Sequence, residues 1–174
     1  MNEILEPVTQ YLEMGGPVLK YGITTLAFLM WTLILERIAY YKLGGLKADI
    51  NQATAVWEAR SERVSWNAHK VREKLISEVN ERVRTNLPMV KTMVASAPMF
   101  GLLGTVTGMI SVFEVMAITG GGDARQMAGG VFSATIPTLS GMVVAIAGVF
   151  ADTYLNRVAN KETMLLEDHL TMDH

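Results

Sequence analysis

Three long stretches without a charged residue constrain this chain more than any other feature. Tyr21 to Leu35 contains 15 uncharged residues, Thr92 to Phe113 contains 22, and Gln126 to Ala151 contains 26. At about 1.5 Å per residue, helices over the second and third stretches would be roughly 33 and 39 Å long, more than a hydrocarbon core about 30 Å thick. Soluble domains are about one quarter charged, whereas this chain is 18% charged. We therefore expect an integral membrane protein.

The first uncharged stretch is the shortest, but it can be lengthened on its N-terminal side. A helix from Gly15 to Leu35 has 21 residues if the Lys20 side chain extends its amino group towards the interface. Trp31, Tyr40 and Tyr41 lie where aromatic side chains commonly mark the membrane interface. The sequence thus predicts an all-α, polytopic membrane protein with three transmembrane helices, at residues 15–38, 92–115 and 127–152, and with long cytoplasmic helical extensions.

The distribution of basic residues predicts the orientation of these helices. Of the 15 Lys and Arg residues, 11 lie between Arg37 and Lys91, and two follow the third span. The other two are Lys20 and Arg125. Cytoplasmic segments carry an excess of Lys and Arg. A cleaved signal peptide is not expected, because no basic segment precedes the first apolar stretch. The sequence therefore predicts a cytoplasmic location for residues 39–91 and for the C-terminal tail 153–174, and an external location for the N-terminal segment 1–14 and the loop 116–126.

The long segment between the first two spans has the composition of a helix. It contains neither Pro nor Gly from Lys47 to Asn86, and Ala, Glu, Arg, Val and Leu dominate it, which predicts one helical stretch. From Arg37 to Lys91, 11 basic residues outweigh six acidic ones, a net charge of +5. This is either a solvated helix that obeys the positive-inside rule or a docking face for a partner or for anionic lipid headgroups. Further on, the polar tail is expected to fray; it ends with Asp168, His169, Asp173 and His174.

Small residues recur at helical spacing in the second and third spans. The stripe of the second span consists of Ala97, Gly101, Gly104 and Gly108, and that of the third consists of Gly130, Ala134, Gly141, Ala145 and Gly148. Inside a membrane, small side chains let helix backbones approach closely and pack well. Both stripes therefore predict close helix contacts, either within one subunit or between subunits.

Hydroxyl side chains lie beside these stripes and indicate a second role for the same spans. Thr105 and Thr138 both fall near the predicted bilayer centre, with Ser133 and Thr135 close to Thr138. An isolated Ser or Thr satisfies its hydroxyl by bonding to a carbonyl of the preceding turn. A group at matched depth can instead line a proton pathway. Two prolines in these spans, Pro98 and Pro137, each remove a helical hydrogen bond and predict kinks.

Ionisable residues are absent from the second and third uncharged stretches. This chain alone therefore has no group that carries a proton across the membrane centre, and a relay needs an acid from another protein. Glu36, Glu114 and Asp152 lie at the ends of the three spans. They are either interfacial charges or gate residues, and Glu36 has Arg37 beside it as a partner.

The remaining composition argues against an enzyme. The chain has no cysteine, which excludes a disulfide, a thiol nucleophile and a Cys-ligated metal. Its histidines, His69, His169 and His174, are too scattered to predict a metal triad, and no His-Glu-x-x-His, phosphate-loop or dinucleotide motif occurs. The net charge of -2 gives no bias towards nucleic acid. We therefore expect no metal, no cofactor and no nucleic-acid partner.

One segment of the second span resembles the signature of a known family. It reads Ala97-Pro98-Met99-Phe100-Gly101-Leu102-Leu103-Gly104-Thr105-Val106-Thr107-Gly108-Met109-Ile110 and is similar to the signature of the ExbB/TolQ branch of the MotA/TolQ/ExbB proton-channel family. Three spans, an external N-terminus, a large cytoplasmic segment and a short external loop also look like that family. The length and the segment from Trp31 to Tyr41 look closest to the short ExbB proteins of TonB systems.

The resemblance implies a proton-driven motor in the bacterial inner membrane. Five copies would enclose transmembrane helices of an ExbD-like, single-span partner, whose membrane aspartate carries the proton. The motion would pass to a TonB-like transducer that energises outer-membrane transport of siderophores, haem or vitamins. Thr105, Thr138 and Gly141 match family positions, whereas Ser133 stands where ExbB and TolQ proteins have a glutamate, and Pro137 is outside the ExbB pattern. A TolQ-like motor for envelope maintenance and a non-motor scaffold are the alternatives.

Overall fold

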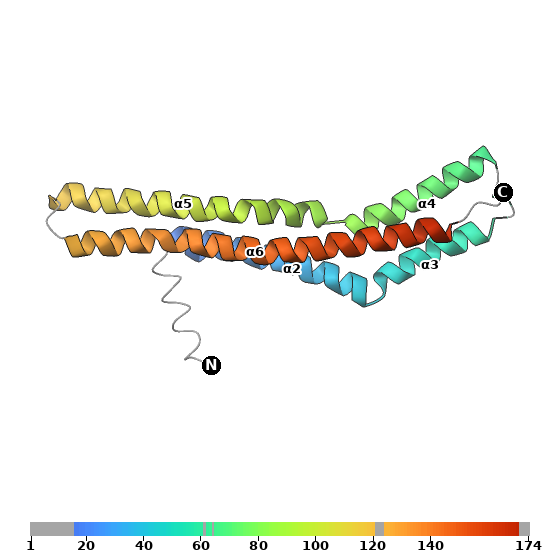
Figure 1. Cartoon of the computed structure of the whole chain (residues 1–174), viewed down its shortest axis with the longest axis horizontal. Helices are drawn as coiled ribbons and strands as arrows, with labels where there is room; N and C mark the ends of the chain where they lie inside the picture. Colours follow the sequence, from blue (N-terminus) through green and yellow to red (C-terminus); the bar gives the residue numbers. More distant parts are fainter. Residues whose placement is uncertain (1–15, 61, 64, 121–123, 171–174) are drawn as a thin grey trace. The chain divides into compact units, whose positions relative to one another are not determined.

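Every regular element in the described part of the chain is a helix (Figure 1). The computed structural model describes residues 16–60, 62–63, 65–120 and 124–170. In chain order the elements are η1 (Val18–Ile23), α2 (Thr24–Lys42), α3 (Gly45–Glu58), α4 (Trp66–Arg84), α5 (Leu87–Thr119) and α6 (Ala124–His169). The all-α prediction is confirmed.

Three helical stretches among the described residues are long and apolar enough to cross a membrane. The first runs from Val18 to Lys42, the second includes α5, and the third lies in α6 from Met127 to His169. The three predicted spans are confirmed as membrane-compatible helices. Helices α2 and α5 continue a few residues past their predicted ends, until the positive-φ glycines Gly44 and Gly120, and α6 continues to His169. The predicted loop 116–126 is accordingly short, with α5 ending at Thr119 and α6 beginning at Ala124.

The first span begins with an irregular turn. Residues Val18–Ile23 form a π-helix, in which each turn is wider than in an α-helix. The Thr24 hydroxyl donates to the carbonyl of Leu19, five residues earlier, at 3.1 Å. Gly22 lies within this turn, and a Cβ added there would be 3.3 Å from the ring of Phe100 in α5. The wide turn therefore coincides with a close contact between the first two spans. The predicted external segment 1–14 lies outside the described residues.

The segment predicted to be helical from Lys47 to Asn86 is helical except for a break, which divides it into α3 and α4. The chain leaves the helix after Glu58 and re-enters it at Trp66. Ser65 caps the new helix by accepting a hydrogen bond from the amide of Ala68 at 3.3 Å. The two helices contact each other. Folding back lets each bury its apolar face, which consists of Leu46, Ala53 and Trp57 in α3 and of Ala68, Val79 and Val83 in α4.

The expectation of a fraying tail is wrong for the residues that the structure describes. Helix α6 continues to His169, and both Leu166 and Leu170 are fully buried. The Arg72 guanidinium of α4 donates to the carbonyl of Leu170 at 2.6 Å and to that of Glu167 at 2.9 Å. Carbonyls at a helix C-terminus lack hydrogen-bond donors from their own helix, and Arg72 supplies donors to two of them. Asp173 and His174 lie outside the described residues.

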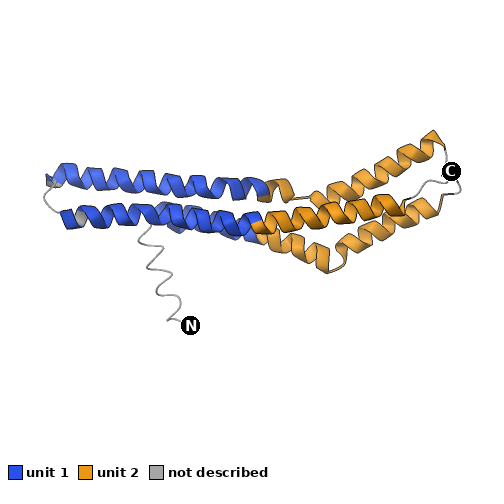
Figure 2. Cartoon of the chain, viewed as in Figure 1, with its two compact units in different colours: residues 1–31, 91–149 blue, residues 32–90, 150–174 orange. Residues whose placement is uncertain are grey.

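The chain divides into two compact units (Figure 2). The first comprises Met1–Trp31 and Lys91–Val149, and the second comprises Thr32–Val90 and Phe150–His174. Part of the core of the first unit joins η1, α5 and α6 through Leu19, Ile23, Ile136, Phe100 and Val144. The second unit buries side chains of α2, α3, α4 and the C-terminal half of α6, including Ile34, Trp57, Val83, Leu155 and Leu166. The four Ser and Thr residues predicted to line a pathway belong to the first unit, and so do both small-residue stripes.

Candidate functional site

The two small-residue stripes face each other where α5 and α6 pack together. A Cβ added to Gly141 would lie 2.5 Å from the carbonyl oxygen of Ala97, and one added to Gly101 would lie 2.9 Å from the Cα of Thr138. Real side chains do not approach backbone atoms so closely. Glycine is therefore required at both positions for the observed contact between the two backbones.

The remaining stripe residues continue this contact along both helices. Gly104 lies against Pro137, Gly108 against Ala134, and Gly130 against Val112. Gly148 lies against Val94 of α5 and Met30 of α2, while Ala97, Ala134 and Ala145 are buried. The structure thus places all the stripe residues within this chain's own helix contacts. Surfaces for a partner must lie elsewhere on α5 and α6.

Both prolines lie inside continuous helices, in different surroundings. Pro98 is exposed on α5, whereas Pro137 of α6 is fully buried against Gly104. Pro137 therefore takes part in helix packing. The predicted kinks at Pro98 and Pro137 stay predictions.

The contact pairs also establish the register of the two antiparallel helices. Because Gly101 meets Thr138 and Gly108 meets Ala134, Thr105 and Thr135 lie at nearly the same level. With 100° of rotation per residue, Thr105 and Phe100 fall on opposite flanks of the α5 contact line. Thr135 and Val144 are likewise on opposite flanks in α6. Phe100 and Val144 pack towards η1, so Thr105 and Thr135 share the flank away from the first span.

The other two predicted pathway residues do not share this flank. Thr138 is half-buried in the helix contact, where its hydroxyl donates to the carbonyl of Gly101 at 3.0 Å. Ser133 is half-buried, and its spacing places it on the side of α6 that carries Ile136 and Val144, towards η1. The structure therefore separates the four predicted residues. Thr105 and Thr135 share one flank, and we call them the flank pair. Thr138 lies in the helix contact, and Ser133 faces the first span.

The hydroxyls of the flank pair bond back into their own helices, as those of Thr107 and Ser111 also do. The Thr105 hydroxyl donates to the carbonyl of Leu102 at 2.7 Å, and the Thr135 hydroxyl donates to the carbonyl of Phe132, also at 2.7 Å. Each bond runs back three residues within its own helix. Both hydroxyl oxygens therefore keep lone pairs that can accept a hydrogen bond from outside the chain.

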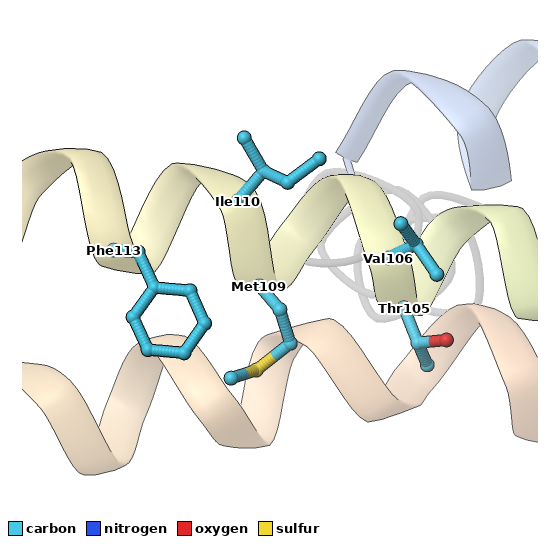
Figure 3. A pocket seen from close by; sticks show the side chains of 5 residues that line it. All are labelled: Thr105, Val106, Met109, Ile110 and Phe113. Atoms are coloured by element: carbon cyan, nitrogen blue, oxygen red, sulfur yellow. The ribbon is translucent and has the colours of Figure 1, made fainter.

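An open apolar hollow extends from Thr105 along α5. Figure 3 shows Thr105, Met109 and Phe113 following one another along the helix, with Val106 and Ile110 beside them. These residues recur every three or four positions, which places them on neighbouring ridges of one helix face. The hollow is lined almost entirely by carbon, and Thr105 supplies its polar edge. An apolar surface of this kind packs against lipid tails or the apolar side chains of another helix.

The three acidic residues predicted at the span ends have different surroundings. Glu36 forms an ion pair with Arg37 at 3.0 Å and accepts a hydrogen bond from the side-chain amide of Asn86 at 3.1 Å. Asp152 is half-buried and accepts from the side-chain amide of Asn156 at 3.0 Å. Glu114 is exposed near the end of α5. Glu36 and Asp152 thus have local partners, and a gate role for any of the three stays a prediction.

The sequence reasoning missed a buried cation in the second unit. Arg37 is 6% exposed, and its guanidinium donates to the carbonyl of Arg82 at 3.1 Å besides pairing with Glu36. One turn further along α2, the Tyr41 hydroxyl donates to the carbonyl of Val83 at 2.8 Å. Two side chains of α2 therefore satisfy consecutive carbonyls at the C-terminal end of α4. Arg37 and Tyr41 are four residues apart and therefore share one face of α2, which is the sequence pattern that could have indicated this contact.

A second polar cluster joins α2, α3 and α4 nearby. The Tyr40 hydroxyl donates to the carboxylate of Asp49, and Arg82 pairs with the same carboxylate at 2.8 Å. The hydrogen bond from Tyr40 lowers the pKa of the Asp49 carboxyl below its usual value, and the hydrogen bond and charge of Arg82 act in the same direction against the effect of burial. Asp49 is therefore held in its ionised form.

The fold and site define a multi-pass membrane protein whose two closely packed helices carry hydroxyls but no ionisable side chain from Thr92 to Phe113 or from Gln126 to Ala151. Among the described residues, no group of three His, Asp or Glu side chains is placed to hold a metal ion. A sequence profile of the MotA/TolQ/ExbB proton channel family matches residues 37–168, and the chain belongs to this family. Its members are channel and motor proteins, not enzymes.

Individual relatives agree with this assignment. Over 141 residues the chain is 34% identical to the biopolymer transport protein ExbB of Helicobacter pylori, covering 81% of this chain and 79% of that protein. It is 47% identical over 68 residues to a putative ExbB-like biopolymer transport protein of Synechocystis, covering 37% of this chain and 27% of that protein. It is 31% identical over 96 residues to the Tol-Pal system protein TolQ of Pseudomonas aeruginosa, covering 55% of this chain and 40% of that protein. The chain thus spans less than two thirds of the latter two proteins.

Proposed function

We propose that this chain is an ExbB-like subunit of a proton-driven motor in the bacterial inner membrane. The observation that carries the proposal is the combination of family membership with two long stretches, Thr92–Phe113 and Gln126–Ala151, that contain no ionisable residue. A proton crossing the membrane centre needs an acid or base, and this chain has none there. The subunit therefore forms the wall of the pathway, and a partner brings the acid.

The partner of this proposal is an ExbD-like protein with a single span and a membrane aspartate. Its acid lies against the flank that carries Thr105 and Thr135, and its apolar side chains lie along the hollow beside Thr105. When the acid gains or loses its proton, its interaction with this flank changes. The resulting motion of the partner relative to this subunit is passed to a TonB-like transducer. One charge moving through 100 mV supplies about 2.3 kcal/mol, so several protons are required for substantial mechanical work.

The assembly in this proposal rests on the family resemblance, and the orientation rests on the distribution of basic residues. Five copies surround the partner's helices, which gives the exposed apolar faces of α5 and α6 neighbours in the membrane. The N-terminus lies in the periplasm and the C-terminus in the cytoplasm, because 11 of the 15 basic residues lie between Arg37 and Lys91. The load is an outer-membrane transporter for siderophores, haem or vitamins.

A TolQ-like motor for envelope maintenance is the second candidate. The observation in its favour is the 31% identity to TolQ of Pseudomonas aeruginosa over 96 residues. The membrane physics is the same for both motors, and they differ in the transducer that receives the motion. Growth on a defined siderophore as the iron source separates them, because an ExbB-like subunit is required for it and a TolQ-like subunit is not.

A hydroxyl deletion tests the role of the flank. Thr105→Ala removes the hydroxyl from the hollow and should lower energised siderophore uptake at least several-fold while assembly is retained. Thr107→Ala is the matched control: Thr107 is on the same helix and also bonds back to its own backbone, at 3.0 Å to Leu103 and to Gly104. It lies about 200° round the helix from Thr105, so uptake should be preserved. Full uptake in Thr105→Ala would contradict the role of this flank.

A further inference from the structure

The chain turns sharply between α2 and α3, and this corner carries an exposed leucine (Figure 1). Leu43 is 85% exposed, whereas Leu46, three residues later, is 4% exposed and belongs to the apolar face of α3. Leu43 therefore contributes little to the packing of the second unit. Single exposed leucines are common on proteins, so the surroundings of Leu43 decide what its exposure means.

The corner is a well-formed turn that holds Leu43 in this position. Gly44 has a φ of +95°, a left-handed backbone conformation that glycine adopts without strain. The amide of Ala48 donates to the carbonyl of Gly44 at 2.9 Å, so α3 starts directly after the turn. Gly45 lies against the ring of Tyr40, where an added Cβ would be 2.6 Å from a ring carbon. The exposure of Leu43 is therefore a property of the turn itself.

Two lysines flank the leucine, and no acid accompanies them. Lys42 precedes it and Lys47 follows it, both are exposed, and the segment between them contains no Asp or Glu. Among the described residues neither lysine takes part in an ion pair. The next acid along α3 is Asp49, whose carboxylate is already bonded to Tyr40 and Arg82. The corner therefore presents two unpaired positive charges beside an apolar side chain.

The length of the first span indicates the depth of this corner in a membrane. The membrane-compatible stretch runs from Val18 to Lys42, and its 25 residues form a helix roughly 37 Å long. A bilayer is about 30 Å thick in its hydrocarbon core and about 40–45 Å thick with its headgroups. A helix of this length reaches the headgroups, and a lysine at its end lies there because the core disfavours its charge. Leu43 is the next residue, at the boundary between headgroups and acyl chains.

Anionic phospholipids match both features of the corner. Their phosphate is negative and lies next to the acyl chains, and a lysine near a membrane surface attracts such headgroups. The long lysine side chain keeps its ammonium at the phosphate while its methylene groups lie along apolar surface. A leucine at the same level gains free energy of transfer when it leaves water for the acyl chains. An acidic protein surface would match the lysines but not their place at the end of a span.

We propose that the α2–α3 corner binds the headgroup of an anionic phospholipid in the leaflet at this end of α2. Lys42 and Lys47 lie at the phosphate, and Leu43 inserts between the acyl chains. The contact holds the start of α3 at the membrane surface. This inference does not depend on the proposed motor function, because it needs only the span and the corner.

The depth of position 43 in a bilayer tests the insertion. The chain has no cysteine, so Leu43→Cys gives a single site for a nitroxide label in the full chain. The labelled chain is reconstituted in vesicles of phosphatidylcholine and phosphatidylglycerol in equal parts. Electron paramagnetic resonance compares collisions of the label with oxygen, which concentrates in membranes, and with a water-soluble nickel complex. We expect access for oxygen and exclusion of the nickel complex.

A matched label and two contrary outcomes make this test decisive. Met164→Cys, at a 66% exposed apolar position of α6 beyond the third span, is the control and should collide with the nickel complex. Access of the nickel complex to position 43 would overturn the inference. Exclusion of both reagents from position 43 would overturn it too, because it marks a contact with a second copy or with another protein.

Charge variants test the binding of the headgroup. Lys42→Gln combined with Lys47→Gln should weaken the binding of short-chain phosphatidylglycerol to the detergent-solubilised chain about fivefold per lysine, while the binding of short-chain phosphatidylcholine changes little. Isothermal titration calorimetry measures both lipids. Lys70→Gln combined with Lys74→Gln is the control, because it removes the same charge from two exposed lysines of α4 that are ion-paired on their own helix. Equal weakening by both double variants, or none by the first, would overturn the inference.

Discussion

At the residue scale, Arg37 shows how one buried charge can cap the end of a neighbouring helix. Its guanidinium lies between the Glu36 carboxylate and the carbonyl of Arg82, beneath the ring of Tyr40 at 5.1 Å. Besides Arg37, the carbonyl of Arg82 accepts a long hydrogen bond from the amide of Thr85, at 3.4 Å, and a cation placed at this helix end interacts favourably with the helix dipole. Glu36 is 47% exposed, so it stays solvated if Arg37 is removed. The loss is therefore chiefly the cap on α4.

Replacing this side chain gives a stability prediction. Arg37→Met keeps the apolar stem but leaves the carbonyl of Arg82 without this donor, which should reduce the free energy of unfolding by about 1–3 kcal/mol. Arg37→Lys should recover part of the loss, since one ammonium cannot bond to both Glu36 and Arg82 with the geometry of a guanidinium. Thermal unfolding of the detergent-solubilised protein measures the change. Arg157→Met, at an exposed position of α6, is the control, and an equal loss there would contradict the capping role.

At the element scale, the approach of α5 to α6 depends on glycines that have no space for a side chain. Gly141 faces the carbonyl oxygen of Ala97, and backbone cannot move aside as a flexible side chain can. Gly129, on the same helix, has no atom within 4 Å of an added Cβ. The two glycines have the same intrinsic helix propensity. Their difference therefore isolates the packing contribution.

Replacing each of these two glycines by alanine should have different effects on the free energy of unfolding. Gly141→Ala should lower the free energy of unfolding by about 1–3 kcal/mol, because the two backbones must separate. Gly129→Ala should be neutral or stabilising by up to about 1 kcal/mol, because alanine favours the helix. Unfolding in detergent, followed by circular dichroism, measures both variants. Equal stability of the two proteins would show that the α5–α6 contact does not require glycine.

The sequence predicted where the membrane-spanning helices lie, but not which face of each helix contacts its neighbours. The uncharged stretches predicted three spans, because charged side chains are costly inside a membrane and a long stretch without them is visible in the sequence itself. The helix break between Glu58 and Trp66 was missed, because it depends on the buried apolar faces of α3 and α4. The grouping of Thr105 with Thr135, apart from Ser133, could not be predicted either. It depends on which flank of α5 and α6 the first span covers, and that is a tertiary property.

At the scale of the whole molecule, the two long uncharged stretches contain no acid or base that could carry a proton. The small residues of α5 and α6 are used in contacts within one chain, while apolar side chains remain exposed on both helices. Such surfaces in a membrane contact lipid, another copy of the chain or a partner helix. The family assignment and the absence of ionisable residues from the two long uncharged stretches together favour a partner that carries an acid.

Proton flux into proteoliposomes tests this central claim most directly. The chain alone and its complex with the single-span partner are reconstituted at equal density, and a pH-sensitive dye in the lumen reports proton entry under an applied membrane potential. We predict no flux above that of empty liposomes for the chain alone, and clear flux for the complex, which disappears when the partner's membrane acid is replaced by its amide. Equal flux with and without the partner would contradict the account, because this chain would then carry the proton itself.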